Sequence, residues 1–386
     1  MPSASAICYF DPDTYPGVYN SCNILVEQGW EVDVLALDFY GFGGKAFDPR
    51  VTVHRLGGGD WQDAGGITAF VCFLRGLREL RRQRHWDLVF GHDMMGFVAA
   101  RMAQAAPADR TAFWSQDLVE PGRLSTARRC VYRLKRYFLR TCPLAIAASE
   151  SRATAMQETL PLARPPTVVY NSPRRNIQMP ADGVWRSKLG LTDDTLLGVY
   201  AGGLGHNRYV PELIASVQDW PQNVHLAVAG YGRDALLDEL KVTAERQEFD
   251  GRIHILGHLQ SPFSLLADAD FGVSLFDQDP GHRNLRHRGL ASNKIFENLA
   301  FGNAVVVTRN SETAALVEER YHCGTCVDDH SAAGIATCVR SIVRDREQLA
   351  EMQKQARRVH LEETHFERRF NAITAQCVSP MEYSEC

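Results

Sequence analysis

Short apolar runs alternate with longer amphipathic segments through the first 170 residues of the chain. Their pattern predicts strands at 4–10, 31–37, 51–56, 87–91, 111–115, 144–148 and 167–170. Helical segments, such as 69–84, lie between several of these runs. Because this alternation is typical of parallel strands joined by crossover helices, we expect a parallel sheet that is covered on both faces.

The alternation restarts after a chain-breaking segment at 171–173 and a polar stretch that ends near residue 194. Strands are predicted at 196–203, 225–230, 253–257, 270–276 and 303–308. The pattern therefore predicts an α/β fold with two doubly wound, Rossmann-like domains, at 1–172 and 173–365. Ligands of such sheets bind beyond the carboxyl ends of the strands, so two facing sheets would form a binding cleft.

Composition narrows the class of protein further. The chain has 386 residues, of which 45% are hydrophobic and 23% charged, as expected for a globular protein. No apolar run reaches the roughly 18 to 20 residues that a membrane-spanning helix needs, and the first residues do not resemble a secretory signal. The ten cysteines are scattered, which fits a reducing compartment, so we expect a cytoplasmic protein.

Cys323 and Cys326 form the one close pair of cysteines in the sequence. A CxxC pair supplies half of a zinc site, but no second pair with matching spacing is present. The structural alternative is that Gly324, between them, begins a strand. We therefore predict no metal site.

Charge is distributed unevenly, although the net charge of −4 is mild and predicts no nucleic-acid partner. Residues 121–140 contain seven Lys and Arg and no carboxylate, and apolar side chains are interleaved with these cations. Such a segment suits the surface of an anionic membrane, where each cation contributes about 1 kcal/mol. It equally suits a solvated helix face, and both interpretations stay open.

A glycine-rich turn follows the first predicted strand of the second domain. Gly202, Gly203 and Gly205 precede a predicted helix, and Arg208 lies beside the turn. Backbone N–H groups and a helix N-terminus at this place would face an anion such as a phosphate. The alternative is that the glycines only permit a tight turn.

The segment at 292–308 carries the most specific pattern in the sequence. Ser292 and Asn293 are expected to cap a helix in which Lys294 and Glu297 lie on one face. A cation in the first turn opposes the helix dipole, and a bound diphosphate would explain its presence. A carboxylate one turn later suits a pair of sugar hydroxyls, although an ordinary salt bridge with Lys294 is the alternative.

This segment, SNKIFENLAFGNAVVVT, resembles the nucleotide-sugar signature of GT-B glycosyltransferases, in particular the retaining family 4 enzymes, or glycosyl transferases group 1. The resemblance extends to 226–232, 253–259 and 265–275. In the first domain, WDLVFGHD at 86–93 is similar to the family's strand that ends in a histidine and an aspartate. VVYNSP at 168–173 resembles the crossing between its two domains.

The resemblance implies a UDP or GDP type sugar donor, no cofactor or metal, and transfer with retention to a glycan, lipid-linked or other glycoconjugate acceptor. It places the catalytic residues at His92, Asp93 and Asp117. The residues that it implies for nucleotide-sugar binding are Gly17, Gly202, Gly203, Arg208, Gly230, Gly257, His258, Leu259, Asn284, Ser292, Asn293, Lys294 and Glu297. It also implies that residues 366–386 form a helix and tail that cross back to the first domain.

Within this resemblance, each group has an expected role. Glu297 would bind the ribose hydroxyls, Lys294 and Arg208 the diphosphate, and the backbone at 257–259 the base. Gly17 would approach the diphosphate from the opposite wall. The expected setting is polysaccharide or cell-envelope biosynthesis in the cytoplasm, and the segment at 121–140 leaves a peripheral position at the inner face of the membrane open.

The sequence departs from the family pattern at two places. Many members have a glutamate eight residues before the position of Glu297, and this chain has Gly289 there. A segment that often reads histidine and then glutamate is here Ser115, Gln116 and Asp117, and an amide such as that of Gln116 cannot act as a base. His92 also has a bland alternative, because a histidine at a strand end is often packed and hydrogen-bonded.

Three rival interpretations remain at this stage. The DQD sequence at 277–279 resembles the metal-binding motif of the GT-A fold, although that fold has a single nucleotide-binding domain. A UDP-sugar 2-epimerase shares the two-domain architecture and needs no acceptor. A non-catalytic GT-B subunit that binds a partner enzyme would explain the departures at 116 and 289.

Overall fold

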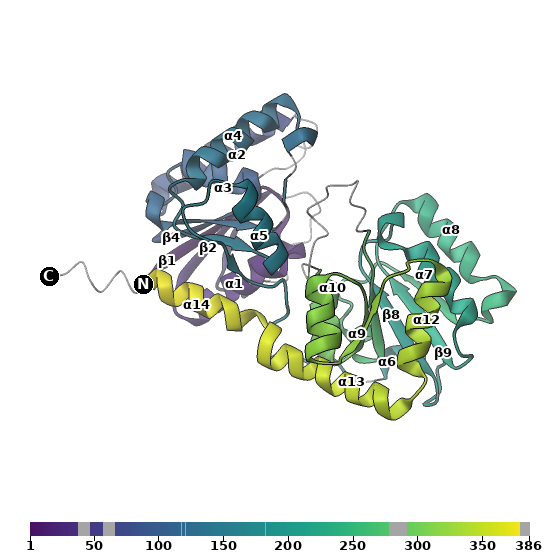
Figure 1. The fold of residues 1–386 in the computed structure, drawn as a ribbon. Coiled ribbons are helices and arrows are strands. Elements are labelled where there is room, and N and C mark those ends of the chain that lie inside the picture. The colour runs from purple at the N-terminus through teal and green to yellow at the C-terminus, as the bar shows by residue number, and fades with distance from the viewer. Residues whose placement is uncertain are drawn as a thin grey trace. The chain divides into compact units, whose positions relative to one another are not determined.

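The computed structural model describes residues 1–37, 47–56, 66–116, 118–119, 121–181, 183–277 and 292–378 (Figure 1). The chain divides into two compact units. Among the described residues, unit 1 comprises the chain up to Asn171 and the segment that begins at Phe366. Unit 2 comprises 172–277 and 292–365.

Unit 1 is built on a seven-stranded sheet whose strand pairs are all parallel, in the order β3-β2-β1-β4-β5-β6-β7. Its strands are β1 (Ser3–Cys8), β2 (Glu31–Leu37), β3 (Thr52–Leu56), β4 (Leu88–His92), β5 (Thr111–Ser115), β6 (Ala145–Ala147) and β7 (Thr167–Val168). All residues of β4 and β5 are buried, as expected for strands that are covered on both faces.

The described helices of unit 1 are α1 (Pro16–Glu27), α2 (Gly66–Gln83), α3 (Asp93–Met102), α4 (Thr126–Leu139), α5 (Glu150–Thr159) and α14 (Phe366–Val378), with short 3₁₀ turns at Pro12–Thr14, Ala108–Arg110 and Pro121–Arg123. The last helix, α14, belongs to this unit although it is the most distant in sequence. Its Phe366, Phe370 and Ile373 are fully buried. The rings of Phe366 and Phe370 stack on Trp114 of β5 at 6.3 and 5.9 Å between centroids.

Unit 2 contains a six-stranded sheet, again with parallel pairs throughout, in the order β10-β9-β8-β11-β12-β13. Its strands are β8 (Leu196–Ala201), β9 (Val224–Ala229), β10 (Ile253–Gly257), β11 (Phe271–Ser274), β12 (Ala304–Thr308) and β13 (Gly324–Val327). The described helices are α6 (Val184–Lys188), α7 (Val210–Ser216), α8 (Asp234–Ala244), α9 (Phe263–Ala267), α10 (Asn293–Phe301), α11 (Ser311–Thr313), α12 (Ala332–Val343) and α13 (Arg346–Val359). Three 3₁₀ turns are η4 (His206–Arg208), η5 (Val217–Asp219) and η6 (Gln247–Phe249), and two π-helical segments are η8 (Ala314–Arg320) and η9 (His360–Thr364).

The strand order confirms the predicted doubly wound class in both units. Each sheet starts from a central strand, β1 or β8, and the order reverses beside it, at β1/β4 in unit 1 and at β8/β11 in unit 2. Ligands of such sheets bind beyond the carboxyl ends of the strands at this switch point. The fold therefore directs attention to the residues after β1 and β4 and to those after β8 and β11.

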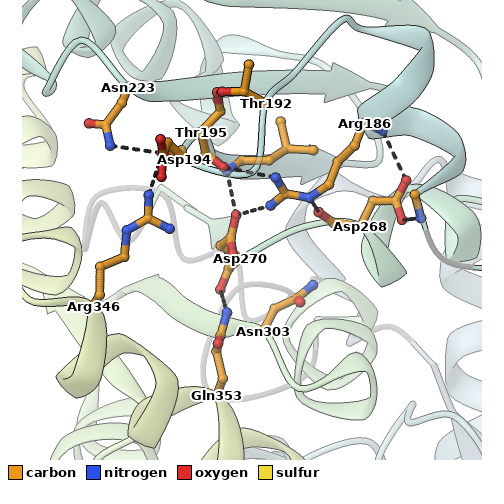
Figure 2. A network of polar contacts seen from close by, with 12 residues as sticks. Arg186, Thr192, Asp194, Thr195, Asn223, Asp268, Asp270, Asn303, Arg346 and Gln353 are labelled. Atoms are coloured by element: carbon orange, nitrogen blue, oxygen red, sulfur yellow. Dashed lines mark hydrogen bonds and ion pairs between the residues drawn. The ribbon is translucent and has the colours of Figure 1, made fainter.

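A polar network lies at the amino ends of β8 and β11 in unit 2 (Figure 2). Arg186 of α6 donates to the carbonyl of Thr195 at 2.9 Å and pairs with the carboxylate of Asp270 at 2.5 Å (Figure 2). The carboxylate of Asp268 accepts from the backbone N–H groups of Gly183 and Trp185. These contacts tie the start of the unit to the amino ends of β8 and β11, away from the expected binding edge.

Candidate functional site

Three glycines lie side by side where the first strands of unit 2 end. The N–H of Gly202, after β8, donates to the carbonyl of Ala229 at 2.8 Å, and the N–H of Gly230 donates to the carbonyl of Gly257 at 2.8 Å. Gly202, Gly230 and Gly257 all have positive φ. The structure therefore gathers three of the sequence-predicted residues along one sheet edge.

Lys294 reaches this edge from the first turn of α10. An ideal Cβ placed on Gly202 would lie 2.1 Å from the Cε of Lys294, closer than real carbon atoms approach. The Lys294 ammonium lies 4.8 Å from the centre of the Tyr200 ring, and the hydroxyl of Tyr200 donates to the carbonyl of Gly203 at 2.7 Å. The glycine after β8 is thus required for the lysine side chain to lie across the turn.

Arg208, at the end of η4, is the second cation of the group. Its guanidinium carbon lies 4.4 Å from the centre of the Phe276 ring. The Lys294 ammonium lies 5.4 Å from the centre of the same ring. Two cations from separate elements therefore share one aromatic neighbour at the β8/β11 switch point.

The pKa values of this group respond to its burial. Burial, and to a lesser extent the like charge of Arg208, lowers the pKa of Lys294 to about 7. Burial raises the pKa of Glu297 to about 7, against the opposing effect of Lys294. In the part of the chain that the structure describes, no ion pair joins Lys294 to Glu297, so the helix salt bridge considered above is not formed.

The expected cap of α10 is only partly present. Ser292 occupies the N-cap position, but its side chain makes no capping hydrogen bond, and the prediction that it would do so is wrong. Its hydroxyl lies 3.4 Å from that of Ser274 at the end of β11, a partner that the local sequence does not reveal. Asn293 is the first residue of the helix and is half-buried.

His258 and Leu259 follow β10 and differ in their surroundings. His258 is exposed, and its ring lies 6.0 Å from that of Tyr231 after β9. Leu259 is partly buried and packs against the core cluster beneath the sheet edge. Tyr231, which is 67% exposed, was not anticipated, although its place between Gly230 and Gly232 at a strand end is a signal that sequence analysis can use.

In unit 1, His92 ends β4 and is fully buried. Its ring stacks on that of Trp114 at 5.2 Å, and its Nδ1 lies 3.4 Å from the side-chain nitrogen of Gln116. Burial lowers the pKa of His92 to about 3, so the imidazole is neutral at physiological pH. At neutral pH such an imidazole can hydrogen-bond a hydroxyl, but it carries no second ring proton to donate and is a weak base.

The neighbours of His92 form a buried polar cluster around Gly17 of α1. An ideal Cβ on Gly17 would lie 3.0 Å from Gln116 Nε2 and 3.2 Å from Asn171 Oδ1. His92 Nε2, Gln116 Oε1 and Asn171 Oδ1 are buried polar atoms without a hydrogen-bond partner among the described residues. Sequence analysis did not single out Asn171, which follows the last strand of unit 1.

Asp93, at the start of α3, holds the backbone of Gln116 through a direct hydrogen bond. Its carboxylate Oδ1 accepts from the backbone N–H of Gln116 at 2.7 Å, and its φ is 53°, an uncommon value for a non-glycine residue. Arg152 of α5 donates to the carbonyl of Gln116. The segment after β5 is thus held from two sides.

Several residues named in the sequence analysis lie outside the described residues: Asp117, Asp279, Asn284 and Gly289. Cys323 and Cys326 are described and buried, and Cys326 lies in β13. Burial raises the pKa of both thiols to about 12. The described residues contain no group of three or more metal-ligating His, Cys, Asp or Glu.

The basic segment forms α4, with Ser125 as its N-cap. Lys135 is only 3% exposed, and its ammonium lies 4.5 Å from the centre of the Tyr132 ring. Its assignment to a basic surface is therefore corrected, because the lysine faces the core. Exposed cations of the helix are Arg128, Arg129, Arg133 and Arg136, followed by Arg140 at its C-cap.

Two family models match the chain, one in each unit. The model described as Glycosyltransferase Family 4 matches residues 17–172, and the model described as Glycosyl transferases group 1 matches residues 198–345. Together they span most of the chain, and the protein belongs to the family 4, group 1 glycosyltransferases. A search of curated proteins finds no match.

Solved structures share the fold over the whole chain. Anabaena HepE in complex with UDP and glucose is 17% identical, with 98% of this chain and 100% of that chain covered and a TM-score of 0.75. Sucrose-phosphate synthase from Thermosynechococcus elongatus is 12% identical, with both chains covered fully and a TM-score of 0.75. WaaG, a glycosyltransferase involved in lipopolysaccharide biosynthesis, is 13% identical, with 97% and 99% covered and a TM-score of 0.67. These likenesses identify the fold as GT-B.

Proposed function

We propose that the protein transfers a sugar from a UDP or GDP type sugar nucleotide to a glycan, lipid-linked or other glycoconjugate acceptor. The observation that carries this proposal is the group formed by Arg208, Lys294 and Glu297 at the carboxyl edge of the group 1 domain. Cleavage of the donor leaves negative charge on the departing diphosphate. Two fixed cations beside that group would stabilise the charge as it develops.

Glu297 is proposed to bind the ribose. An ionised carboxylate accepts two hydrogen bonds at once, which matches the adjacent hydroxyls of a ribose. Its place one helical turn after Lys294 puts the ribose group and the diphosphate group on the same helix. The backbone after β10 and the exposed rings of Tyr231 and His258 are proposed to contact the base.

The cluster in unit 1 is proposed to hold uncharged polar groups, such as sugar hydroxyls. His92 is neutral, and Gln116 and Asn171 carry amides, so the cluster offers hydrogen bonds rather than net charge. His92 would then orient a hydroxyl, and Asp93 would act by holding Gln116. A protonated imidazole is not needed in this scheme.

Transfer without a metal, and with retention, completes the proposal. The two cations supply the neutralisation that a divalent ion gives in other transferases. Retention is supported by the resemblance to the retaining family 4 enzymes.

The acceptor side is proposed to work at the cytoplasmic face of a membrane in cell-envelope or polysaccharide biosynthesis. Among the described residues, no helix combines the length and apolar character that crossing a bilayer requires. The exposed arginines of α4, together with the exposed Leu134 and Tyr137, suit a peripheral contact with anionic lipid. The described cysteines are free, which supports a reducing location.

Proton NMR of the purified protein with a panel of UDP and GDP sugars tests the reaction. Slow hydrolysis of one donor, with release of the sugar first as the anomer present in the donor and with EDTA present, is the expected result. Release of the opposite anomer would contradict retention, and loss of turnover in EDTA would contradict the metal-free scheme. Conversion of a UDP sugar to its 2-epimer without release of UDP would instead identify an epimerase.

Sedimentation with vesicles tests the membrane contact separately. Binding to vesicles with anionic lipid, and none to neutral vesicles, is expected. Reversal of two exposed cations of unit 1, Arg133→Glu with Arg140→Glu, should weaken binding by about thirtyfold or more, since each cation contributes about 1 kcal/mol at an anionic surface. The matched control is Lys241→Glu with Arg246→Glu in unit 2, which makes the same change of charge. Equal weakening by both pairs would overturn the assignment to α4.

A further inference from the structure

The ring of Phe276 lies at the centre of the cation pair in unit 2. It follows β11 at the switch point, and Arg208 and Lys294 both lie within cation–π distance of its centre, at 4.4 and 5.4 Å. These cations come from η4 and α10, and a second aromatic contact of Lys294 is Tyr200 at 4.8 Å. The position of one phenyl ring therefore affects both charges.

The backbone of Phe276 is held by a side chain. The register of β11 with β12 ends at the pair of Ser274 and Val307, so Phe276 lies beyond the ladder. There the hydroxyl of Thr308 accepts from the N–H of Phe276 at 2.8 Å and lies 3.3 Å from its carbonyl oxygen. Thr308 is 3% exposed. The buried Thr308 hydroxyl thus bonds the backbone of Phe276 where the backbone hydrogen bonds between β11 and β12 have ended.

His330, which follows β13, connects the Thr308 hydroxyl to Tyr209, the residue after Arg208. Its Nε2 lies 2.9 Å from the Thr308 hydroxyl, and its ring stacks on that of Tyr209 at 4.3 Å and 21°. Burial lowers the pKa of His330, so it acts here as a neutral hydrogen-bonding and stacking group. Tyr209 directly follows Arg208.

Tyr209 itself has a backbone that needs support. Its φ of 53° lies in the left-handed region, which is uncommon and costly for an aromatic residue. This conformation turns the chain from η4 into α7, immediately after Arg208. The stack on His330 is therefore placed to hold the residue that orients Arg208.

We propose that Phe276, Thr308, His330 and Tyr209 form a positioning cluster that fixes Arg208 and Lys294 against the diphosphate of the donor. The inference rests on the proposed function, which supplies the diphosphate. The reason for such a cluster is the repulsion between two neighbouring cations, which would otherwise move apart before an anion binds. Cations that are fixed in advance need no rearrangement when charge develops on the leaving group.

The cluster is proposed to act on the diphosphate and to leave the base and ribose contacts alone, and a nucleoside monophosphate carries only one of the two phosphates. Its specific signature is the ratio of the dissociation constants for a nucleoside monophosphate and the matching diphosphate. A general loss of structure weakens both ligands equally and leaves the ratio unchanged. Displacement of the cations lowers the ratio because the diphosphate loses more contacts than the monophosphate.

Isothermal titration with UMP and UDP, and with GMP and GDP, provides this ratio. In the wild type we expect the matching diphosphate to bind about tenfold tighter or more, the effect of one charge-assisted contact. Phe276→Leu should lower the ratio by about fivefold or more, whereas Phe276→Tyr, which keeps a ring, should preserve it. Thr308→Val should also lower the ratio, and Thr308→Ser, which keeps the hydroxyl, should not.

The outcomes separate the two proposals. If the wild type binds no nucleoside diphosphate, the proposed function fails and the positioning role falls with it. If the wild type discriminates and both Phe276→Leu and Thr308→Val keep its ratio, the donor site stands and the positioning cluster is refuted. Thr308→Val replaces one hydroxyl by a methyl group of similar size. It therefore still tests the proposal if Phe276→Leu does not fold.

Discussion

Lys294 occupies the space that any side chain at position 202 would need. The distance from an ideal Cβ on Gly202 to the Cε of Lys294 is 2.1 Å, and the φ of Gly202 is +143°. The glycine turn after β8 and the lysine of α10, which are more than ninety residues apart in the sequence, are therefore parts of one site. Any residue larger than glycine at position 202 would therefore have to displace the Lys294 side chain.

Gly202→Ala should weaken the binding of a nucleoside diphosphate by about tenfold or more, because the methyl group displaces Lys294 and the backbone conformation disfavours alanine. The matched control is Gly251→Ala in the same unit, since the φ of Gly251 is also positive (+68°) and a Cβ there would meet no atom within 4 Å. Titration of both variants with the diphosphate that the wild type binds checks this prediction. Equal affinities of the two variants would contradict the coupling of the turn to Lys294.

Glu297→Gln should weaken diphosphate binding by about ten- to a hundredfold, because a neutral amide replaces a carboxylate that accepts two ribose hydroxyls. The control is the 2′,3′-dideoxy form of the same nucleotide, which lacks both hydroxyls. The wild type and Glu297→Gln should bind this analogue with similar affinity. A loss of the same size for both ligands would show that Glu297 acts somewhere other than the ribose.

The pH dependence of binding follows from the pKa values of about 7 for Lys294 and Glu297. A bound diphosphate favours charged Lys294, so its contribution is complete below pH 7 and declines, by up to about tenfold per pH unit, as pH rises above 7. Glu297 accepts hydroxyls best when ionised, so its contribution declines as pH falls below 7. Affinity should therefore be highest near pH 7.

Titration calorimetry between pH 5.5 and 9 would reveal this profile. Lys294→Met should remove the decline on the alkaline side and retain the decline on the acidic side. Glu297→Gln should do the reverse. A wild-type profile that Lys294→Met only shifts to weaker binding, with no change of shape, would count against the role of its ammonium.

The C-terminal helix is predicted to contribute strongly to the stability of unit 1. Phe370 is fully buried and stacks on Trp114, so Phe370→Ala should lower the free energy of unfolding by about 3–5 kcal/mol. Asn371→Ala, one residue further on the exposed face of α14, should change it by less than about 0.5 kcal/mol. Urea unfolding of both variants measures the difference. Similar midpoints would show that α14 adds little to the core.

The sequence predicts the architecture well because the relevant signal is periodic and local. Buried parallel strands such as β8 and β9 are short apolar runs, and the breaks between them are marked by glycine and proline. The segment around Lys294 and Glu297 is equally local, since both residues lie on one helix. These features need no knowledge of distant contacts.

Contacts between distant segments lie beyond such a pattern. The carboxylate of Asp268 accepts from Trp185, a residue 83 positions earlier, so nothing near either residue announces the pair. Ser292 has the sequence of a helix cap, yet its hydroxyl is directed to Ser274 of β11. The link from His330 through Thr308 to Phe276 likewise joins three separate segments.

The burial of Lys135 could have been predicted from the spacing of its apolar neighbours along the helix. Its neighbours at helical spacing, Tyr132 and Leu139, are buried, so the position lies on the apolar face of α4. Counting charges along 121–140 hides this periodicity. The two rings close to its ammonium, Tyr132 and Phe113, offset part of the cost of burying the charge.

Unit 2 is proposed to bind a nucleoside diphosphate through Lys294 and Glu297. A thermal-shift panel of UDP, GDP, ADP, TDP and CMP, with their common sugar conjugates, tests it most directly, on the wild type and on Glu297→Ala, with and without EDTA. A ligand that binds only the folded state raises the melting temperature according to its concentration relative to Kd. We expect a rise with one nucleoside diphosphate that is insensitive to EDTA and absent in Glu297→Ala. No rise with any nucleotide would contradict it and favour a non-catalytic subunit.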